Sequence, residues 1–464
     1  MLNKKKYQES EALRNKMKES LLKDPLLPDF HIYPETGWLN DPNGLCYYQS
    51  LYHIFFQYSP LDENRSDIIW GHLTSKDLIN FKREEPFIYE DSAFDKNGAY
   101  SGSAFIKDNV INFFYTGNVK HPGDFDYINE GREHNTIKIV SDGFSYVKKE
   151  LVMDNDSYPK DMTKHVRDPK IYEKNGNFYM FLGARSTNDK GIIWVFKSKD
   201  LKDFSYHMRI ETDYDFGYMW ECPDFFDLDN KSALICCPQG VKSEEFKYQN
   251  IYQSGYFIID LYLENKSYKL GDFEELDYGF DMYAPQTFED KNNRRILIGW
   301  MGMPDAAYTN PSTKYKWQHI LTIPRVLSIK NGKIYQNPIK ELEKLRNKPI
   351  LLEKGQKYEN LVFEGLAEVK NDYFHINLRE DVNLSYKDKI LMLSMGKSSA
   401  GRDKRKIKIE KIHSLRIFSD KSSLEIFIND GEYVMTSRVY SEKSNFSTDD
   451  LSFTIYPLNK ISIK

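Results

Sequence analysis

Five short runs of apolar and aromatic residues, spaced about sixty residues apart, constrain the fold of this chain more than any other feature. Each run follows a short motif at a distance of 12 or 13 residues. The motifs lie at Asp41, Ser101, Asp168, Cys222 and Pro285, and the runs are centred on Ile54, Phe113, Met180, Ile235 and Leu297. A constant offset is expected of repeated units, and the repeat length fits four-stranded propeller blades with room for loops. The sequence therefore predicts a five-bladed β-propeller.

Three of the motifs place an acid close to a proline: Asp41-Pro42, Asp168-Pro169 and Glu221-Cys222-Pro223. Proline pushes the residue before it toward extended backbone, so we expect the acids to lie on strand-like backbone without an adjacent amide donor. In a propeller, equivalent positions of the innermost strands face one shared axis. We therefore expect Asp41, Asp168 and Glu221 to converge in one pocket.

The charge balance disfavours a polyanionic partner. The 464 residues include 65 basic and 69 acidic side chains, which gives a formal net charge of −4. Because basic and acidic side chains are present in nearly equal numbers, we expect no basic surface for binding nucleic acid. Aromatic residues make up 15% of the chain, enough to supply sugar-stacking rings as well as a core. Most of these rings are expected in the core, and the sequence does not determine the oligomeric state.

Cysteine usage and the start of the chain indicate a cytoplasmic protein. The four cysteines, Cys46, Cys222, Cys236 and Cys237, form neither a disulfide-rich pattern nor a Cys-x-x-Cys metal site. The basic residues near Met1 are followed by polar ones, where a secretory signal would need an apolar stretch. No segment has the pattern of a membrane span. We expect no membrane partner, no metal and no cofactor.

The chain divides into four segments. Residues 1–27 are expected to form an N-terminal helical extension, with a charged helix over 7–23 packed on the outside of the propeller of residues 28–337. A helical linker is expected over 338–349. Alternating patterns over 350–464, with the hairpin signal Asn429-Asp430-Gly431, predict a β-sandwich. The fold class is therefore all-β, a five-bladed β-propeller followed by a C-terminal β-sandwich.

Converged carboxyl groups suit the hydrolysis of glycosidic bonds. When two lie about 5 to 5.5 Å apart, one attacks the anomeric carbon while the other protonates the leaving oxygen, and the configuration is retained; a wider pair inverts it. The competing use is a site for a hard cation, which takes oxygen ligands. Three carboxylates on separate blades, without a dense Asp/Asn loop, favour that use only weakly.

The residues around the acids resemble the β-fructofuranosidases of glycoside hydrolase family 32. The run from Trp38 to Gly44 is similar to the family's nucleophile motif, and the motifs at Asp168 and Glu221 are similar to its second and acid/base motifs. Other similar stretches are Phe56-Gln57-Tyr58, Trp70-Gly71-His72, Ser101-Gly102-Ser103, Asp281 to Gln286 and Gly299-Trp300-Met301. The resemblance covers roughly residues 28 to 345 and extends into the second domain. The family fold, a five-bladed propeller with a β-sandwich, agrees with the repeat count.

This resemblance implies a retaining enzyme that cleaves the β-D-fructofuranosyl bond of sucrose, sucrose 6-phosphate or both through a covalent fructosyl-enzyme intermediate. The expected partner is therefore a small-molecule sugar. It makes Asp41 the nucleophile, Glu221 the acid/base and Asp168 the residue that stabilises the transition state. The residues expected to bind substrate are Trp38, Asn40, Gln57, Trp70, Tyr100, Ser101, Arg167, Tyr283 and Trp300.

One departure from the family concerns the leaving-group side of the site. Many members carry a second tryptophan five residues before Trp70, where this chain has Arg65. A charged loop residue of this kind is usually exposed. Alternatively, its guanidinium group suits the phosphate of sucrose 6-phosphate, with Lys314, Lys316 and His319 as other candidate partners.

Two other functions stay open. Transfer of fructosyl units to another sugar, or the hydrolysis of short fructans, would use the same covalent intermediate and differ in what deacylates it. A non-catalytic propeller would bind sugar without cleaving it. The presence of all three acids argues against such a non-catalytic protein.

Overall fold

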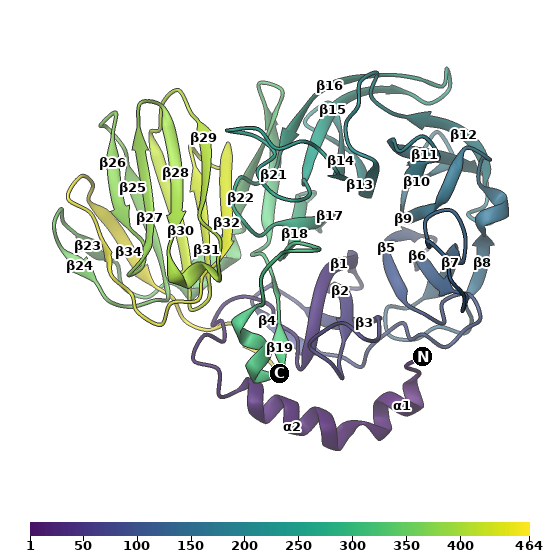
Figure 1. The fold of residues 1–464 in the computed structure, drawn as a ribbon, viewed down its shortest axis with the longest axis horizontal. Coiled ribbons are helices and arrows are strands. Elements are labelled where there is room, and N and C mark those ends of the chain that lie inside the picture. Colours follow the sequence, from purple (N-terminus) through teal and green to yellow (C-terminus); the bar gives the residue numbers. More distant parts are fainter.

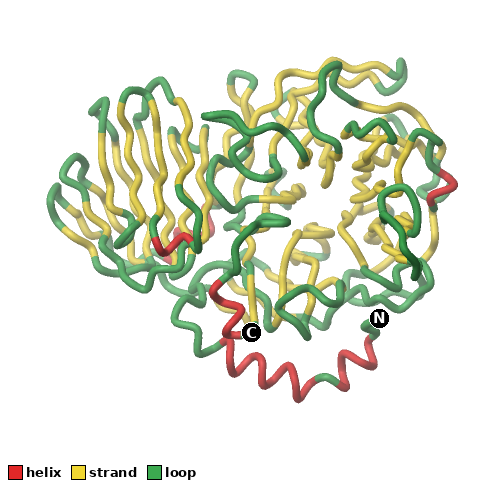
Figure 2. The backbone as a smooth tube through the Cα atoms, in the orientation of Figure 1, coloured by secondary structure: helices red, strands yellow, loops and turns green.

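The computed structural model describes residues 1–464 and is built mainly of strands (Figures 1 and 2). Five mainly antiparallel sheets surround a common axis, and two six-stranded sheets lie to one side of them (Figure 1). The predicted five-bladed propeller followed by a β-sandwich is confirmed. No helix combines the length and apolar character that a membrane crossing requires.

Blades 2, 3 and 4 are four-stranded sheets whose first strand lies innermost. Their strands are β5 (Ala99–Lys107), β6 (Val110–Lys120), β7 (Arg132–Ser141) and β8 (Glu150–Met153) in blade 2; β9 (Met162–Lys174), β10 (Asn177–Ser186), β11 (Gly191–Ser198) and β12 (Ser205–Ile210) in blade 3; and β13 (Met219–Leu228), β14 (Lys231–Gln239), β15 (Gly255–Tyr262) and β16 (Ser267–Glu275) in blade 4.

Blades 1 and 5 receive strands from outside their own repeats. Blade 1 consists of β1 (Gly37–Tyr48), β2 (Leu51–Ser59), β3 (Ile69–Ser75) and β4 (Asn80–Arg83), with β19 (Trp317–Gln318) parallel to β1 and β35 (Ser462–Ile463) parallel to β4. Blade 5 consists of β17 (Tyr283–Glu289), β18 (Arg295–Met301), β21 (Arg325–Lys330) and β22 (Lys333–Pro338), with β20 (Ile320–Leu321) beside β18. The end of the chain therefore returns to the first blade.

The sandwich packs two sheets face to face around a buried apolar core. One sheet contains β23 (Ile350–Leu352), β34 (Phe453–Pro457), β25 (Phe363–Glu368), β30 (Ser414–Asp420), β31 (Ser423–Ile428) and β32 (Tyr433–Arg438). The other contains β24 (Lys357–Tyr358), β33 (Phe446–Ser447), β26 (Phe374–Asn377), β27 (Val382–Lys387), β28 (Ile390–Met395) and β29 (Lys404–Lys408).

Helices are few and short. Where one helix was expected over residues 7–23, the structure has two, α1 (Lys4–Glu9) and α2 (Glu11–Leu21), which cross the outside of the propeller near blade 1 (Figure 1). Tyr7, Met17 and Leu21 are their buried residues. Four 3-10 helices complete the structure: η1 (Asn155–Ser157), η2 (Pro311–Tyr315), η3 (Lys340–Leu345) in the expected linker, and η4 (Lys397–Ser399).

In each innermost strand, the motif lies where the pairing with the second strand is irregular. The register against the second strand shifts between Leu39 and Pro42 in blade 1, and at the corresponding place in β5, β9, β13 and β17. A β-bulge bends its strand and re-aims the side chains beside it. The acids are therefore not strictly equivalent, because Asp41 and Asp168 lie within the shifted segments and Glu221 just precedes one.

A buried charged network joins the propeller to the sandwich. The imidazole of His31 contacts Asp420 at 2.8 Å through Nδ1 and Glu425 at 2.9 Å through Nε2. Arg325 on β21 donates to Glu425 at 2.5 Å and lies 3.3 Å from Asp277. Because buried charges are costly unless they are paired, these contacts hold the two domains in one relative arrangement.

Candidate active site

Asp41 on β1 is held by hydrogen bonds from three side chains. The Ser101 hydroxyl and Gln57 Nε2 donate to its Oδ2 at 2.5 and 3.3 Å, and Asn40 Nδ2 donates to its Oδ1 at 3.0 Å. Burial raises the pKa of Asp41, and the charge of Glu221 adds to this, whereas Ser101, Arg65 and Asn40 oppose it. Donors on both oxygens keep the carboxylate in one orientation.

Glu221 on β13 is held by donors from three other strands. Arg167 of β9 donates to Oε1 through Nε at 2.9 Å and through Nη2 at 2.5 Å. The Tyr283 hydroxyl of β17 and Gln239 Nε2 of β14 donate to Oε2 at 2.5 and 2.6 Å. Gly183 of β10 permits this approach of neighbouring blades, because a Cβ there would lie 2.2 Å from the carbonyl oxygen of Trp220.

Asp168 differs from the expectation of extended backbone without an amide donor. Its φ of 63° is left-handed, its N–H donates to Thr116 Oγ1 at 2.9 Å, and its Oδ2 accepts the N–H of Cys222 at 2.9 Å. The bulge in β9 imposes this backbone, which Asp tolerates better than most residues. Cys222, given no role by the sequence, has a φ of 50° and thereby presents its N–H to the neighbouring acid.

The three carboxyl groups are close enough to perturb one another. Burial raises the pKa of Asp168 to about 7, with Arg167 opposing the shift and the charges of Glu221 and Asp41 adding to it. The side chains of Asp168 and Glu221 are only 6% and 15% exposed. The structure therefore brings together the three acids that the sequence singled out.

Aromatic residues from blades 1 and 5 lie beside these carboxyl groups. Trp38 Nε1 donates to Asn40 Oδ1 at 2.8 Å, and its ring meets those of Trp300 and His319 at 6.1 and 4.3 Å between centroids. Trp300 Nε1 and both ring nitrogens of His319 are buried without a hydrogen-bond partner in the protein. These unpartnered nitrogen atoms can bind hydroxyl groups of a sugar.

Trp70 does not take the place expected of a substrate-binding wall. It is fully buried among Phe55, Phe113 and Tyr115, and its Nε1 donates to the Tyr100 carbonyl at 3.0 Å. Its side chain packs into the core between blades 1 and 2. Trp70 instead supports the half-buried Tyr100, which remains beside the site.

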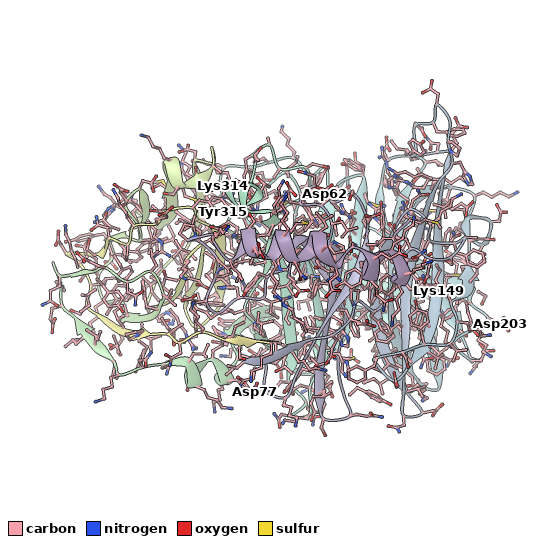
Figure 3. All side chains as sticks on the ribbon, turned by 90° about the horizontal axis from the view of Figure 1, so that it is seen from below. Asp62, Asp77, Lys149, Asp203, Lys314 and Tyr315 are labelled. Carbon is pink, nitrogen blue, oxygen red and sulfur yellow. The ribbon has the colours of Figure 1, made fainter.

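The four candidate phosphate partners differ in exposure and in the groups that they contact. Arg65 is exposed and lies by the site, where its Nη2 donates to Gln57 Oε1 at 2.9 Å. Lys316 is paired with Glu63 at 2.7 Å, and His319 is buried between tryptophans. Figure 3 shows Lys314 and Tyr315 of η2 near Asp62, in the same loop as Glu63. Neither Arg65 nor Lys314 has a carboxylate partner, but Lys314 lies 4.8 Å from the centre of the Tyr315 ring, whereas Arg65 binds Gln57, which in turn binds Asp41.

Several residues of the site were not predicted. Gln239 lies just after the apolar run of blade 4, and Gln57 lies near the end of the run of blade 1, so this parallel could have indicated Gln239. His165 accepts a hydrogen bond from Arg167 Nη1 at 2.7 Å, and Thr116 binds the backbone of Asp168. No sequence signal distinguishes these two from core residues. A hollow of ≈ 770 Å³ lies mainly on the sandwich and is lined by none of these residues, so the size of a hollow does not by itself locate the site.

Neighbouring carboxyl groups of this kind suit the hydrolysis of glycosidic bonds. Residues 31–338 match the model of the glycosyl hydrolases family 32 N-terminal domain, and residues 367–456 match that of the family 32 C-terminal domain. The chain belongs to glycosyl hydrolase family 32.

Relatives and solved structures agree with this assignment. The chain is 39% identical to a sucrose-6-phosphate hydrolase of Bacillus subtilis over 91% of its own length and 90% of the relative's. The structure of a sucrose-6-phosphate hydrolase from Lactobacillus gasseri superposes with a TM-score of 0.90 at 28% identity, covering 99% of this chain and all of that one. A Bombyx mori β-fructofuranosidase variant in complex with sucrose gives a TM-score of 0.87 at 27% identity, with both chains covered in full.

Proposed function

We propose that this protein hydrolyses the β-D-fructofuranosyl bond of sucrose and sucrose 6-phosphate. The observation that carries the proposal is that Asp41 and Glu221, each bound by its own set of donors, lie beside a third carboxyl group on the innermost strands. The names of the similar proteins, sucrose-6-phosphate hydrolase and β-fructofuranosidase, support the choice of substrate.

In the proposed reaction, Asp41 attacks the anomeric carbon of the fructosyl unit while Glu221 gives a proton to the glucosyl oxygen that leaves. A covalent fructosyl ester forms on Asp41. Glu221 then takes a proton from water, which attacks the same carbon and releases fructose with retained configuration. Arg167, Tyr283 and Gln239 hold Glu221 for both proton transfers.

Asp168 is proposed to stabilise the transition state. Its carboxylate can accept hydrogen bonds from fructose hydroxyl groups, and its negative charge favours the positive charge that develops on the sugar ring. Asn40, Gln57 and Ser101 hold Asp41, and Trp38, Tyr283 and Trp300 supply the ring surfaces around the sugar.

A cytoplasmic location is part of the proposal. A phosphorylated disaccharide carries nearly two negative charges and does not cross a bilayer unaided, so its hydrolase is expected where the phosphate is attached. The four free cysteines accord with a reducing compartment.

The decisive experiment measures fructose release from sucrose and sucrose 6-phosphate. The parent protein should release fructose from both, and Asp41→Asn should lose at least about 10³-fold in kcat, in line with removal of a nucleophile. With Glu221→Gln and a substrate with a good leaving group, mass spectrometry should detect one fructosyl unit bound to a peptide that contains Asp41. No fructose from the parent protein would refute the proposal.

A further inference from the structure

Three cations beside the site have no acidic partner. They are Arg65, in the loop after β2, Lys120, the last residue of β6, and Arg132, the first residue of β7, and together we call them the basic cluster. Their contacts are with neutral groups. Arg65 binds Gln57, Lys120 lies 5.3 Å from the centre of the Tyr127 ring, and Arg132 Nη1 lies 3.2 Å from His165 Nε2.

The positive charges of the basic cluster repel one another, yet the fold places them close together. Lys120 and Arg132 are directly opposite each other in the β6–β7 ladder, a position at which like charges destabilise a sheet. Burial and the guanidinium groups of Arg132 and Arg65 lower the pKa of Lys120. The nearest acid along β7, Glu133, forms no ion pair with either cation and instead contacts His121 at 2.7 Å and Asn135 at 3.1 Å.

Contacts link the basic cluster to both Glu221 and Asp41. Arg132 contacts His165, and His165 accepts a hydrogen bond from Arg167, which in turn binds Glu221. At the other end, Arg65 lies 5.8 Å from the Tyr100 ring and donates to Gln57, which binds Asp41. The cations are thus placed around the region where the glucosyl group leaves, because Glu221 protonates the oxygen of that group.

The donors of the cluster are not all used within the protein. Arg132 Nε is buried with no hydrogen-bond partner, whereas Arg65 and Lys120 are exposed. A phosphate monoester carries about −1.5 to −2 charges at pH 7 and offers three acceptor oxygens. Guanidinium groups bind such oxygens in a bidentate manner, and an ammonium group acts as a point charge.

We infer that Arg65, Lys120 and Arg132 bind the phosphate on the glucosyl unit of sucrose 6-phosphate, so that the protein prefers this substrate to sucrose. The inference rests on the proposed function. It accounts for a like-charge pair in a β-ladder, since the ligand supplies the negative charge that the protein lacks at this place.

The test is the ratio of kcat/KM for sucrose 6-phosphate to kcat/KM for sucrose. Lys120→Gln and Arg132→Gln should each lower this ratio by about 10-fold, and the double variant by about 100-fold, as expected for the loss of charge-assisted contacts. Added salt should raise KM for the phosphorylated substrate more than KM for sucrose. Arg209→Gln, on the outermost strand β12 and paired with Asp161 and Glu211, should leave the ratio at the wild-type value.

Two further measurements separate a binding role from a structural one. Lys120→Gln should not lower the temperature of thermal unfolding, because it removes a repulsion. Calorimetric titration should show that glucose 6-phosphate binds the wild type more tightly than glucose, and that the double variant loses this difference. A ratio within about twofold of wild type in the double variant would overturn the inference while sucrose hydrolysis by the parent protein still stands. Absence of any hydrolysis would instead count against the proposed function.

Discussion

Arg167 pairs with Glu221, which belongs to the next blade, rather than with Asp168, which follows it in the chain. Its Nε and Nη2 lie 2.9 and 2.5 Å from Glu221 Oε1, whereas Nε is 4.0 Å from Asp168 Oδ2. Consecutive side chains of a strand point to opposite faces, and the bulge at Asp168 changes that alternation only in part. The guanidinium group therefore orients the proposed acid/base.

Arg167→Gln should lower kcat by about 10²- to 10³-fold, because Glu221 loses two charge-assisted hydrogen bonds and its orientation for proton transfer. Arg167→Lys keeps the charge without the planar fork and should recover only part of the loss. Steady-state kinetics on sucrose would check this. If kcat of Arg167→Gln stayed within about threefold of wild type, Arg167 would not position Glu221.

Asp168→Asn should stabilise the folded protein more at alkaline than at acidic pH. The folded-state pKa is raised from 3.8 to about 7, so ionisation of Asp168 costs folding free energy that grows as pH rises through this window and is complete above it. Asn keeps an oxygen that can accept the Cys222 N–H. The free energy of unfolding should therefore rise by on the order of 2 kcal/mol more at about pH 8.5 than at about pH 5.

Urea denaturation of both proteins at the two pH values measures this difference. Asp203→Asn, at an exposed turn, serves as the control and should show no such dependence on pH. An equal effect of Asp168→Asn at both pH values would contradict the expected cost of its ionisation.

His319→Phe should weaken catalysis without weakening the fold. Burial, together with the charges of Arg438 and Arg65, lowers the pKa of His319 well below 6.5, so the neutral ring offers one donor and one acceptor. Neither nitrogen has a partner in the protein, and loss of a sugar contact there should lower kcat/KM for sucrose by about 10-fold.

His53 gives a matched control for His319, since its Nε2 is also buried without a partner but lies in the core of blade 1. His53→Phe should leave kcat/KM unchanged. Equal effects of the two substitutions on kcat/KM, or a large fall in the unfolding temperature of His319→Phe, would show that His319 acts in packing only.

His31→Gln should loosen the contact between propeller and sandwich. Burial by itself lowers the pKa of His31, but hydrogen bonds and charge from Asp420 and Glu425 outweigh it and raise the pKa above 6.5. Its stabilisation is therefore full below the unfolded-state pKa and is lost as pH rises through the folded-state pKa. Breaking such a buried pair typically costs about 3–5 kcal/mol.

The unfolding free energy of His31→Gln should therefore fall furthest below wild type at about pH 6, and the gap should narrow at about pH 9. Chemical denaturation at both pH values, followed by tryptophan fluorescence, provides the comparison. A gap that stayed constant or widened toward pH 9 would show that protonation of His31 does not contribute to this interface.

Repetition made the fold predictable. Apolar runs that become buried second strands, such as Tyr52 to Tyr58 on β2, are local patterns, and the constant offset of the motifs reports the same turn in every blade. The additions that complete blade 1 were not predictable. The strands β19 and β35 contain two residues each, too few for any periodic pattern, and they pair because distant parts of the chain meet.

The sequence by itself determined the class of fold and identified the three acids, because strand periodicity and short motifs depend only on residues that are close together in the chain. Only the tertiary structure decided how those acids are held. Arg167 binds the acid of another blade, the Cys222 N–H binds Asp168, and Trp70 supports Tyr100 from the core. Each of these contacts joins residues brought together by the closure of the propeller, and bulges set their direction. Such geometry cannot be predicted from residues that are neighbours in the sequence.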